Sequence, residues 1–208
     1  MSSCLLYGYR RLFTVKAGGV SLSRKQYWEE INKASEKVSS LMYSFWHEYS
    51  DWGNWQFWLI LLFLLAPLVV LLIKLDRRKS LEILFLGYTV HMLWTYTDLA
   101  LIRQGFLDHN YFLVPFLPQG LGITASFLPV AFMLAYQYCI NHDKKFPVWA
   151  LVLSAVIAFG FAPIEEAIGL LSTQKGFTIA YLFFIDFAIS MIAYGMTKFF
   201  TQFYSARQ

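Results

Sequence analysis

The chain has 208 residues, of which 58% are hydrophobic, 19% aromatic and only 14% charged. About a quarter of the residues in a soluble domain are charged, so this composition argues against a soluble domain and, with so many aromatic residues, against a disordered chain. Two cysteines cannot build a disulfide framework. The net charge of +4 comes from basic residues at the ends of apolar segments, which indicates membrane topology rather than nucleic-acid binding.

Residues 1–22 show no sustained period and are predicted to form a loose basic N-terminal tail. Whether the first 19 residues belong to the mature protein stays open, because a start codon can be assigned upstream of the real one. Residues 23–50 are predicted to form an amphipathic interfacial helix, because Ser23 and Gln26 have capping-box spacing and apolar residues then recur every three or four positions. We expect this helix to pack on the membrane spans or to lie on the membrane surface, with a partner-binding helix as the alternative.

The segment from Trp55 to Ile73 contains 19 residues without a charge and is the clearest membrane span. Tryptophans precede it and a basic cluster follows it, as at the two interfaces of a membrane. Pro67 lies inside it and is expected to bend the helix. Four more apolar segments follow, so the predicted fold is all-α, a bundle of five transmembrane helices between residues 54 and 200. The spans cover about 55–75, 81–102, 120–140, 146–171 and 177–200, followed by a C-terminal tail at 201–208.

Residues 111–140 carry no charge, and 30 residues are too many for one straight span. Prolines and glycines interrupt the first part, so we expect residues 111–119 to form an interfacial or re-entrant segment. Five spans place the two termini on opposite sides of the membrane. Eight basic residues lie near the spans on the C-terminal side, against Arg103 and Lys175 in the opposite loops. The positive-inside rule therefore predicts an outer N-terminus and a cytoplasmic C-terminus.

Ionisable side chains inside spans are costly, so each needs a partner or a function. The predicted topology places five of them in the outer half of the bilayer, where we expect an intramembrane polar pocket. Its candidate residues are His91, Asp98, Glu165, Glu166 and Asp186. Glu165 and Glu166 cannot share a helix face, so one of them is expected to point into the bundle. Carboxylates and imidazole both bind cations and relay protons, which makes either role possible for the pocket.

The alternative is that these groups pair with one another and with Arg103 and perform no chemistry. Metal binding is less expected than proton or cation handling, because the chain lacks closely spaced His and Cys ligands, and no cofactor is implied. His47 is expected at the membrane interface and His109 in solvent, within a polar turn.

Small residues recur every four positions along the fourth span, at Ser154, Ala158 and Ala162. Small side chains let helices approach closely. We expect this stripe to pack within the monomer, with a homo-oligomer seam as the alternative.

Three family comparisons bear on function. Pro163-Ile164-Glu165-Glu166 resembles the Pro-x-Glu-Glu element of the small membrane lycopene cyclases, in which the acids are thought to protonate a polyene. Intramembrane CAAX-type proteases also have paired glutamates, but the arginine that follows them in that family is Leu170 here. The whole chain resembles uncharacterised small polytopic membrane proteins of spore-forming Firmicutes in its size, the aromatic residues before the first span, the basic turn at 75–79 and the proline-rich stretch at 111–119. That resemblance implies a bacterial plasma membrane and assigns no functional residue.

These observations lead to two hypotheses. The first is a multi-pass integral membrane protein without enzymatic activity, either accessory or handling a small cation or proton through its buried acids. The second is an intramembrane enzyme that acts on a lipid or isoprenoid substrate, with Glu165 or Glu166 as the general acid. The lipid bilayer is the expected partner, and no nucleic acid is expected.

Overall fold

The computed structural model describes residues 23–205, with side chains up to residue 202. The predicted tail at residues 1–22 lies outside this range. The described part is mostly helical, as the sequence predicted. The α-helices are α2 (Arg24–Phe45), α3 (Trp55–Lys74), α4 (Ser80–Gln104), α5 (Leu128–Asn141), α6 (Phe146–Val156), α7 (Ala162–Ala167) and α8 (Ile179–Ser205). Three π-helices adjoin them, η1 (Trp46–Ser50), η2 (Ile123–Phe127) and η3 (Ile157–Phe161).

The chain divides after Leu41 into two compact units. In the first unit, α2 begins with the expected capping box. The Ser23 amide donates to Gln26 Oε1 at 2.8 Å, and the Gln26 amide donates to Ser23 Oγ at 3.4 Å. The apolar side chain of Ile31 is 51% exposed. The helix predicted for residues 23–50 is therefore confirmed, while its place on a membrane surface stays a prediction.

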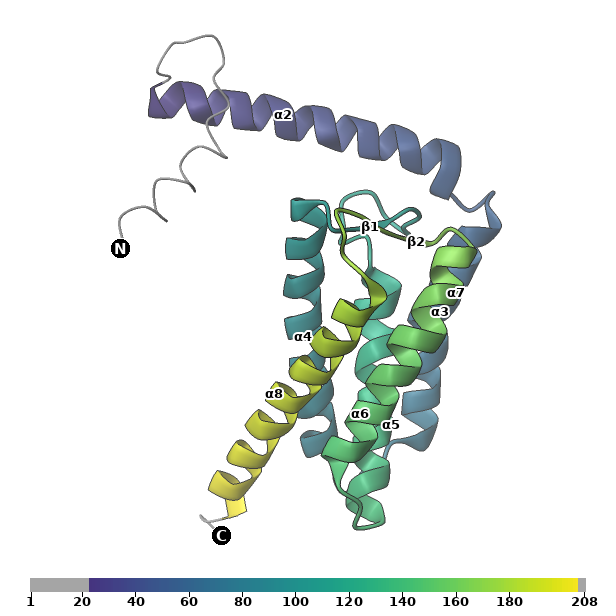
Figure 1. Cartoon of the computed structure of the whole chain (residues 1–208), viewed down its shortest axis with the longest axis vertical. Helices are drawn as coiled ribbons and strands as arrows, with labels where there is room; N and C mark the ends of the chain where they lie inside the picture. The colour runs from purple at the N-terminus through teal and green to yellow at the C-terminus, as the bar shows by residue number, and fades with distance from the viewer. Residues whose placement is uncertain (1–22, 206–208) are drawn as a thin grey trace. The chain divides into compact units, whose positions relative to one another are not determined.

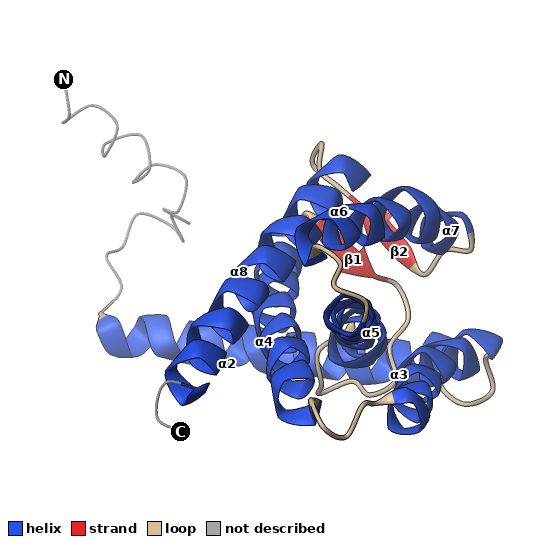
Figure 2. Cartoon of the chain, turned by 90° about the horizontal axis from the view of Figure 1, so that it is seen from below, coloured by secondary structure: helices blue, strands red, loops and turns tan. Residues whose placement is uncertain are grey.

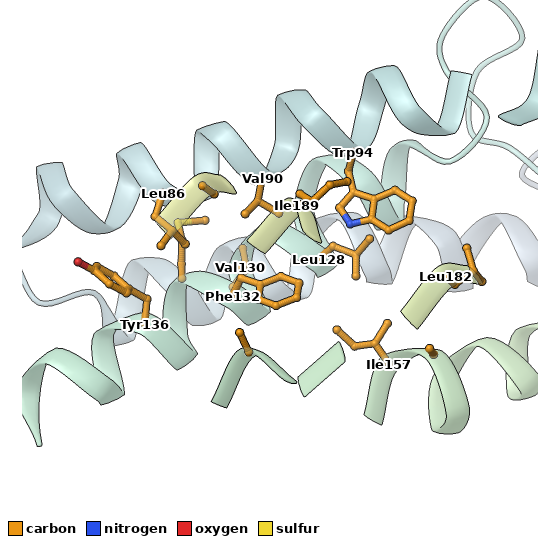
Figure 3. Packing of buried hydrophobic residues seen from close by; sticks show 14 of the residues in the cluster. Leu86, Val90, Trp94, Leu128, Val130, Phe132, Tyr136, Ile157, Leu182 and Ile189 are labelled. Carbon is orange, nitrogen blue, oxygen red and sulfur yellow. The ribbon is translucent and has the colours of Figure 1, made fainter. Parts of the chain in front are cut away.

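The second unit is a bundle in which successive helical segments run in opposite directions (Figure 1). Seen end-on, α5 lies among α3, α4 and α6 (Figure 2). Leu86 and Val90 of α4 and Phe132 of α5 are completely buried in the core between them (Figure 3). Burial of such apolar side chains is the main favourable contribution to folding. Helix α4 packs against both α5 and α8, and α5 is the most enclosed helix of the bundle.

Four helical segments within residues 23–205 are long and apolar enough to cross a membrane. They are Trp55–Lys74, Ile123–Asn141, Phe146–Ala167 and Ile179–Gln202. These segments correspond to the first, third, fourth and fifth predicted spans. The second predicted span, residues 81–102, is helical as α4, but α4 is not one of the four because His91, Asp98 and several hydroxyl side chains lower its hydropathy.

The second unit carries large apolar side chains on its outside. Leu72, Ile73 and Leu81 are 72–86% exposed. Polar side chains, by contrast, are buried inside it, including Asp98 and Asp186, which are 2% and 1% exposed. Water disfavours a large apolar surface of this kind, whereas hydrocarbon suits it. The distribution is that of a helix bundle compatible with a membrane.

Two helices widen into π-helices just before a proline. η2 ends two residues before Pro129, and η3 ends two residues before Pro163. Proline has no amide proton to donate and its ring crowds the carbonyl one turn earlier, so a wider turn relieves the conflict. The π-helices pack together because Phe127 and Phe161 stack with ring centroids 4.4 Å apart. In α3, by contrast, the α-helix continues through Pro67.

A short β-ribbon departs from the all-α prediction. Strand β1 (Leu107–His109) pairs antiparallel with β2 (Leu171–Thr173), and His109 lies opposite Leu171. The fourth span was predicted to continue to residue 171, but its helix ends at Ala167. That prediction was wrong because residues 168–173 are apolar enough to resemble a helix end yet turn back to pair with β1.

The turn before β2 is held by specific contacts. Gly169 has a φ of 75°, a conformation that glycine adopts readily at a helix C-terminus. The Asn110 side-chain amide donates to the Gly169 carbonyl at 2.9 Å and to Ser172 Oγ at 2.8 Å. These bonds fix the ribbon at one end of the bundle.

Residues 111–119, expected to be re-entrant, form turns without helix. The Phe112 amide donates to Ser50 Oγ at 3.3 Å, and Trp46 Nε1 donates to the Leu113 carbonyl at 2.9 Å. Phe112 and Leu113 are buried. This segment is therefore anchored to η1, and its depth in a membrane stays a prediction.

We predict that Gly122→Ala destabilises the bundle. A Cβ at Gly122 would lie 2.9 Å from the Ile60 carbonyl oxygen of α3, and a backbone atom cannot move aside cheaply. The expected cost is about 1–3 kcal/mol, typical of overpacking. Gly195→Ala is the matched control, because a Cβ there meets open space and alanine favours helix. Thermal unfolding of the full chain in detergent checks this prediction, and equal midpoints for the two variants would contradict it.

Candidate functional site

A cavity, here called the acidic cavity, lies beneath the β-ribbon between α4, α7 and α8. Its empty space is about 460 Å³ including the part that opens outward, and its interior has room for only a few water-sized molecules. Ten of its fifteen lining residues are apolar, contributed mainly by η2, η3 and the adjoining helices. The polar lining residues are Asp98, His109, Thr124, Glu165 and Asp186.

Asp98 and His109 form a buried pair in this cavity. His109 Nε2 and Asp98 Oδ1 are 2.9 Å apart, and their side chains are 10% and 2% exposed. Because an ionised carboxylate only accepts, the proton of this bond belongs to His109 Nε2. Asp98 Oδ2 has no hydrogen-bond partner in the described part of the chain.

Gly120 packs directly against this pair. A Cβ at this position would lie 2.6 Å from His109 Nε2 and 2.7 Å from Asp98 Oδ2. Only glycine lets the backbone pass so close to both side chains. The segment before η2 therefore closes one side of the pair and helps to keep it away from bulk water.

The two adjacent glutamates face different surroundings. Glu165 of α7 is 6% exposed and lines the acidic cavity. Its carboxylate makes no side-chain hydrogen bond within residues 23–205. Glu166 instead points to the β-ribbon, where Thr173 Oγ1 donates to its Oε1 at 2.8 Å. The expectation that only one of the two glutamates points into the bundle agrees with this arrangement.

Asp186 reaches the same cavity from α8. It is 1% exposed, and its Oδ1 accepts a hydrogen bond of 2.9 Å from Trp94 Nε1 of α4. A buried acceptor with a matched donor of this kind fastens α8 to α4. Asp186 therefore has a structural partner, which Glu165 lacks.

His91 does not reach the acidic cavity. Its Nδ1 lies 2.9 Å from the Thr124 carbonyl oxygen of η2 and 3.3 Å from Thr95 Oγ1. Of the five sequence candidates, the structure thus brings Asp98, Glu165 and Asp186 together around one cavity. It places His91 about two turns before Asp98 along α4 and Glu166 at the ribbon.

A second, smaller cavity lies on the other side of His109 and Glu165. Its empty space is about 280 Å³ and it is lined by α3, by Tyr111 and by Gln119, among others. His109, Glu165 and Ile123 line both cavities and so form the wall between them. The His109 imidazole and the Glu165 carboxyl group therefore border both cavities.

One expectation about a partner was wrong. His109 was expected in solvent, but β1 turns it inward onto Asp98. The alternative hypothesis paired the buried acids with Arg103, but the Arg103 side chain is exposed and forms no ion pair with them in the described residues. Helix α4 ends at Gln104 and His109 lies in β1, so the pair depends on a turn of the chain and no helical period in the sequence indicates it.

The small-residue stripe is used inside the chain. Ser154 and Ala158 are completely buried and Ala162 is 4% exposed, and the last two line the acidic cavity. The stripe thus packs within the bundle, as expected, and offers no free surface for a homo-oligomer seam. An oligomer would have to use another face.

Within residues 23–205, no cluster of His, Cys, Asp and Glu has the geometry to hold a metal ion. Comparison of the chain with models of protein families, with curated proteins and with solved structures finds no match.

His109 lies in β1, outside the helices that are candidates to span a membrane. Burial lowers the pKa of its imidazolium. The hydrogen bond to Asp98 and the negative charges of Asp98, Glu165 and Asp108 outweigh burial, and together they raise this pKa above its ordinary value of 6.5. The His109 imidazole is consequently protonated to a greater extent than a free histidine at the same pH.

We predict a pH-dependent contribution of His109 to stability. Because the folded chain binds this proton more tightly than the unfolded chain, the contribution is complete below pH 6.5 and is lost as pH rises through the raised pKa. His109→Gln should therefore lower the unfolding temperature most at acidic pH, with a difference that shrinks as pH rises. Thermal unfolding of the full chain in detergent measures this.

His47→Gln is the matched control, since the His47 side chain is 86% exposed. It should leave the pH profile of the parent unchanged. A loss for His109→Gln that is equal at every pH would contradict a charged pair.

Proposed function

We propose that this chain is a multi-pass membrane protein that binds and releases a proton, or a comparably small cation, at the acidic cavity. The observation that carries the proposal is the wall of His109 and Glu165 between two cavities. Two carboxyl groups of the acidic cavity are without full pairing. Asp98 Oδ2 is buried with no hydrogen-bond partner in the described residues, and Glu165, 6% exposed, accepts no hydrogen bond from any side chain there. An unsatisfied buried acceptor is stabilised by a donor, and a proton or a protonated cation supplies one.

Membrane residence and orientation are part of this proposal. The four apolar helices and the apolar outer surface support it. Two basic turns meet at the end of the bundle opposite the ribbon, where Lys79 Nζ donates to the Ile140 carbonyl at 3.1 Å and to Asn141 Oδ1 at 2.9 Å. Under the positive-inside rule that end is cytoplasmic, so the acidic cavity faces outward. The whole-chain resemblance makes a bacterial plasma membrane the proposed location.

The proposed exchange needs few groups. His109 Nε2 keeps its proton in the bond to Asp98, so Nδ1 is the imidazole atom that gains and loses one. Glu165 then accepts or returns a proton at the same wall. Toward the cytoplasmic end the core is filled by apolar side chains such as Leu86, Val90 and Phe132 (Figure 3). We therefore propose exchange with the outer side and an accessory or sensing role, without a path through the membrane.

We predict that Glu165→Gln removes one titrating carboxyl group from the cavity. Infrared spectroscopy of the full chain in lipid resolves the C=O stretch of a protonated carboxyl group in apolar surroundings. The parent should show a band that appears on acidification, and Glu165→Gln should lose it. Glutamine keeps the size of the side chain, so the helix should stay folded.

Glu166→Gln is the matched control, because Glu166 lies one residue away and points to Thr173 instead of the cavity. It should keep the band. Loss of the band in both variants, or in neither, would contradict the assignment to Glu165.

A second function is favoured by one observation, the apolar lining of the acidic cavity beside the unpaired Glu165. An apolar cavity with one acid suits a lipid or isoprenoid substrate that is protonated by Glu165, as in the enzyme hypothesis. Incubation of the protein in lipid with polyprenyl and polyene substrates, followed by mass spectrometry, tests it. Turnover that Glu165→Gln abolishes would favour the enzyme, and no turnover with an intact titrating band would favour proton binding alone.

A further inference from the structure

A different cavity opens at the basic end of the bundle, between the turn after α3, the start of α4 and the end of α8. Its empty space is about 950 Å³ including the part open to the outside. Its lining residues are Arg77, Arg78, Lys79, Ser80, Leu81, Glu82, Phe85, Thr197, Phe200 and Thr201. We propose that this basic cavity binds an anionic phospholipid, with the phosphate against the arginines and an acyl chain along the phenylalanines.

The two arginines are available for a phosphate. Both side chains are exposed, and in the described part of the chain neither forms an ion pair with a carboxylate. A guanidinium group presents paired N–H donors that match phosphate oxygens. Lys79, by contrast, is engaged with the Ile140 carbonyl and Asn141, so it adds charge without being free to move.

The acid in this cavity does not cancel its positive charge. Glu82 Oε1 accepts a hydrogen bond from the Tyr136 hydroxyl and lies 3.3 Å from Lys198 Nζ. Lys198 therefore neutralises Glu82 from outside the cavity lining. The remaining three cations give the cavity the charge that complements an anionic headgroup.

The other part of the cavity is apolar. Leu81 is 86% exposed and Phe200 is 52% exposed, and Phe85 packs edge-on against Phe200 with ring centroids 5.3 Å apart. Free phosphate could contact the arginines but would leave the apolar side chains uncovered. A neutral acyl chain could cover the apolar side chains but would leave the arginines without an anion. A phospholipid with net negative charge satisfies both halves at once.

The position of the cavity agrees with this occupant. Phe200 lies near the end of the candidate span Ile179–Gln202, and the arginines follow directly after the candidate span Trp55–Lys74. Both ends belong to the same face of a membrane, where headgroups meet acyl chains. The inference rests on the proposed membrane residence but not on proton binding at the acidic cavity.

The experiment measures lipid binding to the purified full chain in a neutral detergent by native mass spectrometry. Phosphatidylglycerol is the anionic probe, phosphatidylcholine the neutral lipid, and inorganic phosphate the headgroup without a chain. The double variant Arg77→Gln/Arg78→Gln should bind phosphatidylglycerol about tenfold more weakly than the parent, since each surface cation contributes modestly to anionic lipid binding. Phe200→Ser should weaken the same lipid while leaving the arginines in place.

The matched control is Lys144→Gln/Lys145→Gln. It removes the same charge from the other basic turn, whose lysines are exposed and do not line the cavity. This control should bind phosphatidylglycerol within about twofold of the parent, because its lysines do not line the cavity and their exposed charges are screened by salt. Equal weakening by both double variants, equal affinity for phosphatidylcholine, or displacement of the lipid by an equal concentration of inorganic phosphate would overturn the proposal. The infrared band of Glu165 is unaffected in every case, so the two proposals fail separately.

Discussion

Helix α4 imposes the constraint on which the bundle depends. It carries an aspartate, a histidine and several hydroxyl groups, and the face that holds Trp94 and Asp98 is buried within the bundle. Each buried polar group on it needs a partner, because an unpaired one costs more than its hydrogen bond would contribute. Asp98 pairs with His109 of β1, eleven residues further along the chain, and Trp94 pairs with Asp186 of α8, 92 residues further. These two hydrogen bonds help to hold the β-ribbon and α8 against α4.

The prolines of the neighbouring helices shape the space around α4. The π-helices η2 and η3 each end two residues before a proline, and their stacked phenylalanines hold them together. Widened turns displace side chains from the regular helical face, and such turns are frequent at functional sites. Ile123 and Thr124 of η2 and three residues of η3 line the acidic cavity. The prolines that interrupt the regular α-helix thus lie next to the segments that line the candidate site.

Charge is separated between the two ends of the bundle. Acids and His109 gather beneath the ribbon, while the free arginines gather at the opposite end. An apolar core separates the two groups (Figure 3). This separation agrees with the two proposals, in which a proton binds at the acidic end and an anionic phospholipid binds at the basic end.

Local patterns in the sequence were sufficient to predict the helices and the candidate acids. Apolar period, charge-free length and capping signals are local, so they identify α2, α3 and the apolar spans without knowledge of the partner segments. The tertiary structure alone decided that His109 turns inward, that Glu165 faces the cavity while Glu166 faces the ribbon, and that His91 stays apart. The physical reason is distance along the chain. The pairing of His109 with Leu171 and the bond from Trp94 to Asp186 join segments that no local pattern relates, and these contacts determine which polar groups share one cavity.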